Sequence, residues 1–245
     1  MHNEAAWTCQ SVHDAISLHN NQMGDRHMKT FKTHTLETAP SASHTALQGV
    51  KENIGFVPNV FAAIAESPLA LDTFVALNGA FGASSLNPQE QQIVLLATST
   101  ENNCVYCVAG HTAFANQINM SQQDIDAMRK MRPLKDDKLQ ALNRLARQMV
   151  RGRGRVSDTD IKDFLAAGYT RQQFFEVIIG VCVKTFSNYV SIGLELELDA
   201  AFQIYAWEGT NAIATNQGHA RKSLTTSVSF QGKVAPKPEV HLNEA

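Results

Sequence analysis

The sequence lacks several features that would set it apart from ordinary globular proteins. Its 245 residues include only four cysteines, too few for a secreted scaffold held by disulfides. The amino-terminal stretch lacks the apolar core of a signal peptide, and the most apolar run, FFEVIIGVCV, has ten residues and contains Glu176. A net charge of −2 gives no general attraction to nucleic acid or to a membrane. We therefore expect a cytoplasmic protein that binds neither.

Basic residues are missing from one long segment of the chain. No Lys or Arg occurs between Glu52 and Met128, whereas the segment from Arg129 to Arg155 has ten basic residues and two acidic ones. We expect these two blocks to complement each other within the fold or between subunits. A surface for phosphate or nucleic acid around RGRGR (residues 151–155) is the weaker alternative, because no aromatic residues are interleaved with the arginines.

Both ends of the chain differ in composition from its middle. Residues 1–27 are polar, rich in His and Asn, and show no sustained periodicity, and Met28 opens a stretch that reads like a natural start. The residues from about 210 to 245 are rich in Thr, Asn, Gln, Ser and Gly. We expect mobile extensions at 1–27 and 210–245, with one folded domain at 28–209 between them.

Signals for helix starts dominate the folded part. NPQE places Asn87 as an N-cap, Pro88 at the first helical position and Glu90 at the capping-box position. SQQD, SDTD and TRQQ, which begin at residues 121, 157 and 170, repeat this signature. After Thr170, apolar residues recur at every fourth position, which favours a helix over a strand. Because alternation typical of strands is scarce elsewhere, the sequence predicts an all-α domain of about seven or eight helices.

The stretch ENNCVYCVAGH (residues 101–111) holds two of the four cysteines and one of the nine histidines. If Asn103 caps a helix here, Cys104, Cys107 and His111 share one helical face. The helix start favours a thiolate at Cys104, and in second place at Cys107, because of its free N–H groups and the helix dipole. His111 lies one turn beyond Cys107 and can exchange a proton with it. Since a CxxC pair can close a disulfide after one sulfur is oxidised, the pattern indicates dithiol redox chemistry.

Three other interpretations of this stretch stay open. The cysteines could be inert packing residues, although their small and polar neighbours argue against a deeply buried site. Cys104, Cys107 and His111 could bind zinc with an open fourth position, but no second CxxC or HxxxH accompanies them. His111 alone is more often a buried structural histidine than a base, and only its spacing from Cys107 favours the base.

Residues 86–115, LNPQEQQIVLLATSTENNCVYCVAGHTAFA, resemble the carboxymuconolactone decarboxylase-like superfamily, in particular its AhpD-like alkylhydroperoxidase branch with a CxxCxxxH motif. The resemblance extends to flanking stretches and covers about residues 28–208. It implies an all-helical AhpD-like domain that forms homo-oligomers, often trimers or hexamers. It also implies peroxide reduction without a metal or other cofactor, in which Cys107 attacks, Cys104 resolves the product and His111 belongs to a proton relay.

One position departs from the pattern of the AhpD-like branch. That pattern has a relay glutamate twelve residues before the first cysteine, where this sequence has Gln92. Glutamine can hold a hydrogen bond but cannot take a proton. Glu90, two residues away, is better explained by its capping role. Glu101 is close to the cysteines in the sequence and is the alternative relay acid, provided that it turns inward.

Three further residues receive simpler interpretations. Cys182 is expected to be a small buried hydrophobic residue in an apolar helix. Cys9, in the predicted amino-terminal extension, is expected to be an incidental thiol. Tyr106, between the two motif cysteines, either lines a pocket or packs in the core, and the sequence does not decide between these.

The sequence thus predicts a thiol-dependent peroxidase or disulfide oxidoreductase. Its substrate would be an (alkyl) hydroperoxide, and an external dithiol or thioredoxin-like protein would reduce it again. The first alternative is a decarboxylase or lactone-processing enzyme of the same superfamily, whose anionic substrates require fixed cations that the segment 52–128 lacks. The second alternative is a non-catalytic redox-sensing assembly protein that uses the disulfide as a switch.

Overall fold

A computed structural model of the chain describes residues 31–210. Within this range it has nine α-helices, two 3₁₀ helices and no strand, which confirms the all-α prediction with one or two more helices than expected. Cys9, the extension at 1–27 and nearly all of the extension at 210–245 lie outside the described residues. The elements are η1 (Ser41–Ser43), α2 (His44–Ile54), α3 (Asn59–Ile64), α4 (Pro68–Gly82), α5 (Pro88–Glu101), α6 (Val105–Gln117), α7 (Gln122–Arg129), α8 (Asp137–Arg151), α9 (Asp158–Ala166), α10 (Arg171–Gly193) and η2 (Ala200–Tyr205).

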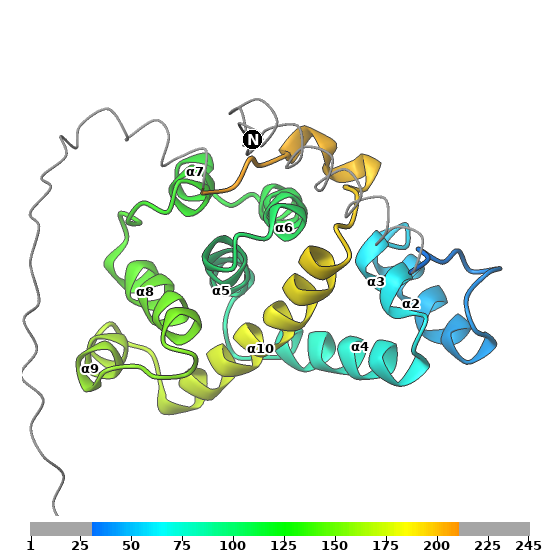
Figure 1. Cartoon of the computed structure of the whole chain (residues 1–245). Helices are drawn as coiled ribbons and strands as arrows, with labels where there is room; N and C mark the ends of the chain where they lie inside the picture. The colour runs from blue at the N-terminus through cyan, green and yellow to red at the C-terminus, as the bar shows by residue number, and fades with distance from the viewer. Residues whose placement is uncertain (1–30, 211–245) are drawn as a thin grey trace, which may run out of the picture.

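Helix α5 lies at the centre of the fold, and the longest helix, α10, crosses beside it (Figure 1). α5 contacts α6, α7, α8 and α10, and its residues 93–100 are all buried. A helix that is buried all round needs no polar face, which fits its run of apolar and small residues. The carboxyl end of α5 leads directly into α6, so the CxxC motif lies at the core of the domain.

The predicted capping residues set the starts of these helices. Asn87, Ser157 and Thr170 each form a complete capping box with the residue three positions later. Ser121 caps α7 by accepting a hydrogen bond from the N–H of Asp124. These four N-caps are confirmed.

Helix α10 packs unusually close to α4 and α5. A Cβ atom at Gly180 would lie 2.5 Å from the ring of Phe81 and 2.8 Å from Val94, so this position requires glycine. By length and composition α10 also meets the criterion for a membrane-crossing helix, which the sequence analysis did not expect. However, it contacts α3, α4, α5, α6 and α8, as the core helix of a globular domain does.

The acidic and basic blocks of the sequence meet between α5 and α8. Glu90 of α5 lies 3.2 Å from Lys138 of α8. Glu101, at the end of α5, accepts hydrogen bonds from Arg147 and Arg151 of α8 at 2.7–2.8 Å. The expectation that the two blocks complement each other is therefore confirmed within the fold.

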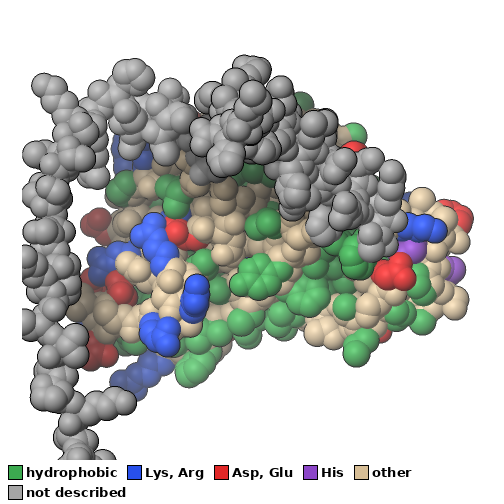
Figure 2. Space-filling model, in the orientation of Figure 1, with side chains coloured by type: hydrophobic (Ala, Val, Ile, Leu, Met, Phe, Trp, Pro, Cys, Tyr) green, Lys and Arg blue, Asp and Glu red, His purple; other side chains and the backbone are tan. Residues whose placement is uncertain are grey.

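The outer face of α10 is apolar and exposed. Phe175 and Tyr189 are about two thirds exposed, and Ile178 and Ile192 lie on the same helix with more than a third of their surface exposed. Hydrophobic side chains gather across this region of the molecule, while Lys and Arg gather toward α8 and α9 (Figure 2). Cys182 is exposed, so the expectation that it is buried is wrong. Its apolar neighbours in the sequence are split between a core face and this outer face.

Candidate functional site

The first cysteine of the motif is itself the N-cap of α6. Its Sγ accepts a hydrogen bond from the N–H of Cys107 at 3.4 Å, and α6 begins at Val105. Asn103, which the sequence analysis took as the cap, has a positive φ of 54°. Asparagine adopts this left-handed conformation more readily than most residues, and here it forms the sharp turn between α5 and α6. The cap therefore lies one residue later than expected.

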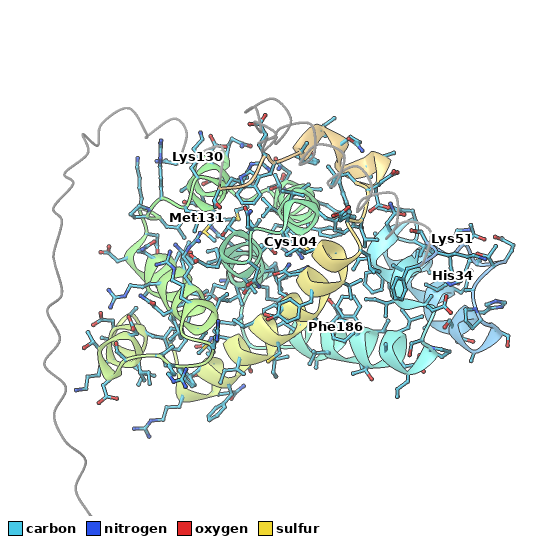
Figure 3. The ribbon with its side chains drawn as sticks, in the orientation of Figure 1. His34, Lys51, Cys104, Lys130, Met131 and Phe186 are labelled. Carbon is cyan, nitrogen blue, oxygen red and sulfur yellow. The ribbon has the colours of Figure 1, made fainter. Side chains whose placement is uncertain are left out.

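Both motif cysteines are free thiols in the core of the domain. Cys104 is 1% exposed and Cys107 is 2% exposed, so the expectation of a shallow site, drawn from their polar neighbours, is wrong. Figure 3 shows Cys104 at the centre of the molecule, where α5, α6 and α10 meet. Cys107 lines a pocket, whereas Cys104 lies behind it. A small molecule that enters the pocket therefore meets Cys107 first.

A polar stripe on α10 faces the cysteines. It consists of Lys184, Ser187, Asn188 and Ser191, all buried, and their spacing places them on one side of the helix. The Sγ of Cys107 lies 3.9 Å from the hydroxyl oxygen of Ser187 and 3.7 Å from that of Ser191. These contacts surround the sulfur of Cys107 with hydroxyl groups and a nearby ammonium group.

The surroundings of the two cysteines shift the pKa values of their thiols in opposite directions. Burial by itself raises the pKa of the Cys107 thiol, but hydrogen bonding from Cys104, the charge of Lys184, and hydrogen bonds from Ser191 and Asn188 together lower it to about 5. The pKa of Cys104 is raised, first by its hydrogen bond to Cys107 and then by burial. At neutral pH the pair therefore holds a thiolate on Cys107 and a thiol on Cys104. The helix start was expected to favour the thiolate on Cys104 first; its N–H group does contact the sulfur of Cys104, but the pKa shifts favour Cys107.

His111 lies between an amide and an amine. Its Nδ1 is 3.0 Å from Oε1 of Gln92, and its Nε2 is 2.8 Å from Nζ of Lys184. An ammonium group can only donate, so Nε2 accepts from Lys184 and the proton on Nδ1 is donated to Gln92. Burial, and then the charge of Lys184, lower the pKa of His111 well below 6.5. His111 is therefore a neutral imidazole whose lone pair is occupied.

The expected relay is only partly assembled. Gln92 does lie beside His111, at the place that the resemblance gives to a glutamate. Direct proton exchange between His111 and Cys107 is not supported, because the hydrogen bonds of His111 go to Gln92 and Lys184. Glu101 does not replace the relay acid: both of its oxygens are bound by Arg147 and Arg151 of α8, so it turns away from His111. This corrects the interpretation of Glu101.

The pocket in front of Cys107 has a volume of about 110 Å³, and its walls include four phenylalanines and a tyrosine. Tyr106 both lines this pocket and packs in the core, since its hydroxyl donates to Asp199 and accepts from the N–H of Val60. Asn78, one of its lining residues, is exposed, so the pocket reaches the surface of the molecule. The lining residues are Ile54, Pro58, Val60, Phe61, Phe74, Asn78, Tyr106, Cys107, Gly110, His111, Phe114, Lys184 and Phe202.

The geometry does not support the zinc site, because His111 is not available as the third ligand. Both ring nitrogens of His111 are bound to other side chains, so neither is free to serve as a third ligand. In the described range, 31–210, no three His, Cys, Asp or Glu side chains are grouped to hold a metal ion.

The polar stripe of α10 was missed in the sequence. Its signal is KTFSNYVS (residues 184–191), in which a lysine, two serines and an asparagine fall at positions 1, 4, 5 and 8 of an otherwise apolar helix. Polar residues at that spacing share one helical face, and a lysine among them within a core helix indicates a site. The stretch belongs to the part that resembles the AhpD-like branch, but no role was assigned to these four residues.

Taken together, the fold and the site define an all-helical domain with a buried dithiol at the start of a central helix. Residues 68–148, from α4 to most of α8, match the model of the carboxymuconolactone decarboxylase family. This match, together with the all-helical fold, confirms the resemblance to the carboxymuconolactone decarboxylase-like superfamily and its AhpD-like branch that the sequence indicated. No functionally curated protein matches the chain significantly.

Solved structures share this fold at low sequence identity. An uncharacterized peroxidase-related protein from Ralstonia eutropha, described as an alkylhydroperoxidase AhpD core, is 21% identical, with a TM-score of 0.64 over 70% of this chain and 93% of its own. A peroxidase-related protein from Silicibacter sp. is 20% identical, with a TM-score of 0.62 over 71% and 92%. The debrominase Bmp8 is 15% identical, with a TM-score of 0.59 over 68% and 90%. These likenesses concern the fold.

Proposed function

We propose that this chain is a thiol-dependent peroxidase or disulfide oxidoreductase that reduces alkyl hydroperoxides through Cys107 and Cys104. The observation that carries the proposal is the arrangement of the two cysteines: Cys107 lines a pocket, and the sulfur of Cys104 lies directly behind it, hydrogen-bonded to the N–H of Cys107. The lowered pKa of Cys107 supports the same assignment. A thiolate is the nucleophilic form of cysteine, and a CxxC partner can resolve its oxidised product.

The proposed reaction has three steps. The Cys107 thiolate attacks the terminal oxygen of R–O–O–H, so that an S–O bond forms and the O–O bond breaks. The alkoxide that leaves takes a proton from the Lys184 ammonium group. The Cys104 thiol then condenses with the sulfenic acid on Cys107 and releases water. An external dithiol reduces the disulfide, and its two protons restore the Cys104 thiol and the Lys184 ammonium group while Cys107 returns as a thiolate.

His111 and Gln92 support Lys184 in this scheme. The Nδ1 proton of His111 is fixed by Gln92, so Nε2 always presents a lone pair to the ammonium group. That hydrogen bond holds Lys184 against the pocket and gives its proton an adjacent acceptor. His111 is thus a positioning residue for Lys184, in place of the base for Cys107 that its spacing had indicated.

The decarboxylase alternative has gained one supporting feature. Its anionic substrate requires a fixed cation, which was missing from residues 52–128, but Lys184 from α10 supplies one in the pocket. A decarboxylase has no need for the thiolate on Cys107 or for its partner Cys104. The dithiol therefore favours redox chemistry, and decarboxylation is the second candidate.

Assembly and reduction are part of the proposal. The exposed apolar face of α10, with Phe175, Ile178, Tyr189 and Ile192, is suited to contact a second copy of the chain, as the resemblance to oligomeric proteins implies. Because both motif sulfurs are buried, a small dithiol that enters through the pocket is favoured as the reductant over a direct protein contact. Sedimentation of the full chain measures the number of subunits.

A steady-state assay tests the proposed activity. We expect consumption of tert-butyl hydroperoxide with dithiothreitol as reductant, abolished in Cys107→Ser and slowed in Cys104→Ser, where dithiothreitol itself must reduce the sulfenic acid on Cys107. Cys182→Ser is the matched control, because this exposed cysteine lies outside the pocket and should retain full activity. If wild-type protein consumes no hydroperoxide although its thiols are reduced, or if Cys107→Ser is as active as wild type, the proposal is wrong. The same absence of turnover would favour the redox-sensing alternative when the disulfide still forms.

A further inference from the structure

The amine of Lys184 is a buried cation without a carboxylate beside it. The residue is 8% exposed, and none of the ion pairs found in residues 31–210 includes it. Its Nζ instead donates to the neutral Nε2 of His111 at 2.8 Å. Asp199, which contacts the pocket residue Tyr106, accepts hydrogen bonds from Tyr106 and from the N–H of Asn59. Burying an ammonium group is costly unless a negative charge compensates it.

Cys107 provides that charge in one state of the protein only. Its thiolate interacts with Lys184 while the pair is reduced. Once Cys107 is bonded to Cys104 or to oxygen, its sulfur is neutral, and the ammonium group has no described counter-charge. A site with an unbalanced cation facing a pocket is suited to an anion.

The walls of the pocket limit what else the ligand can be. Phe61, Phe74, Phe114, Phe202 and Tyr106 line it, so the body of a ligand meets aromatic rings. Its volume of about 110 Å³ compares with the roughly 150 Å³ of an engineered apolar cavity that binds benzene. With an open mouth beside it, such a space accommodates a single ring or a short branched chain, and a nucleotide or a long acyl chain is too large.

We propose that this pocket binds a small molecule with a one-ring or short branched apolar body and a single carboxylate, whose oxygens contact Lys184 while the body lies among the aromatic walls. The proposal rests on the proposed function in one respect, that the substrate of Cys107 occupies this pocket. It adds that an organic acid occupies the pocket once Cys107 has lost its charge, as a product of the reaction or as an inhibitor of the return to the reduced state. A neutral ligand of the same shape leaves the ammonium group uncompensated and binds more weakly.

The thiolate and the carboxylate compete for the same cation. Two anions next to one ammonium group repel each other, so the carboxylate binds more tightly when Cys107 carries no charge. Replacement of Cys107 by serine creates that state without any redox chemistry. The affinity of the pocket for an anion therefore differs between reduced wild-type protein and Cys107→Ser in a predictable direction.

Binding of three probes to the full chain tests the proposal. Calorimetric titrations with benzoate, its neutral isostere benzamide, and acetate are compared in Cys107→Ser. A hydrogen bond to a charged group contributes enough to give a preference of about 10- to 100-fold for benzoate over benzamide. Acetate, which lacks the ring, binds more weakly than benzoate. Lys184→Met in the same background removes the preference, and Lys184→Arg keeps part of it.

The outcomes separate this proposal from the proposed activity. Equal binding of benzoate and benzamide, no benzoate binding at millimolar concentration, or an unchanged preference in Lys184→Met each overturns the anion site. Tighter benzoate binding to Cys107→Ser than to reduced wild type supports it, and equal binding to both contradicts the competition for Lys184. Oxidation of wild-type thiols by tert-butyl hydroperoxide is measured separately, so a failure of the peroxidase proposal leaves the binding result intact, and the reverse holds too.

Discussion

Replacing Lys184 by Met removes an ammonium group from the site and keeps a long side chain in its place. The charge of Lys184 is one of the causes that lower the pKa of the Cys107 thiol to about 5, after burial has raised it. An opposite charge a few ångströms away typically lowers a pKa by about 1–3 units, so Lys184→Met should raise the pKa of Cys107 to about 6–8. Cys107 would then titrate close to neutral pH.

The consequence for reactivity depends on pH. At pH 6, a thiol with a pKa of about 5 is roughly 90% ionised, whereas one with a pKa of about 7 is roughly 10% ionised. Alkylation of Cys107 in Lys184→Met should therefore be about tenfold slower than in wild type at pH 6, and the two rates should converge above pH 9, where both thiols are ionised. Lys184→Arg keeps the charge and should remain close to wild type.

Pulse alkylation with iodoacetamide, followed by peptide mapping, measures this pKa for Cys107 separately from Cys9, Cys104 and Cys182. The reasoning is refuted if the pH profiles of wild type and Lys184→Met coincide. It is also refuted if Lys184→Met lowers the rate by the same factor at every pH, because that result indicates a loss of structure and no change in ionisation. Lys184→Arg distinguishes the lost charge from the altered shape.

Three other predictions follow from the site. Gln92→Glu places a carboxylate beside Nδ1 of His111, and this negative charge raises the pKa of His111. The pH profile of the hydroperoxide reaction should therefore gain an ionisation near neutral pH, and an unchanged profile contradicts this. Glu101→Gln leaves Arg147 buried without its partner and lowers the unfolding free energy by about 3 kcal/mol in urea titrations, while thiol reactivity stays unchanged. Because the pKa of His111 is depressed, stability falls as pH drops below about 6.5, and His111→Gln should weaken this acid sensitivity in thermal melts; identical pH dependences refute it.

The helices could be predicted from local signals, because capping boxes and apolar periodicity depend on residues a few positions apart. Asn87, Ser157 and Thr170 cap as expected for that reason. Asn103 does not, since a polar residue that suits a cap also tolerates the left-handed conformation that a sharp turn requires. Cys182 shows a second limit: in a long helix with two apolar faces, periodicity cannot tell the core face from the outer one.

Local spacing in the sequence could predict only those site residues that lie close together on one helix. Cys104, Cys107 and His111 were identified because their spacing is local, and the resemblance placed Gln92 beside His111. Lys184 is 73 positions from His111 and enters the site through packing of α10, which no local pattern reports. The orientation of Glu101 depended in the same way on its distant arginine partners in α8.

The most direct test of the central claim is the covalent state of the two motif cysteines after one equivalent of hydroperoxide. Fully reduced protein is treated with tert-butyl hydroperoxide, quenched by acid and mapped by mass spectrometry. The account predicts an intramolecular disulfide between Cys104 and Cys107, together with one equivalent of tert-butanol, and a sulfenic acid on Cys107 in the Cys104→Ser variant. Both thiols remaining free, or a sulfenic acid on Cys104 in place of Cys107, would contradict it.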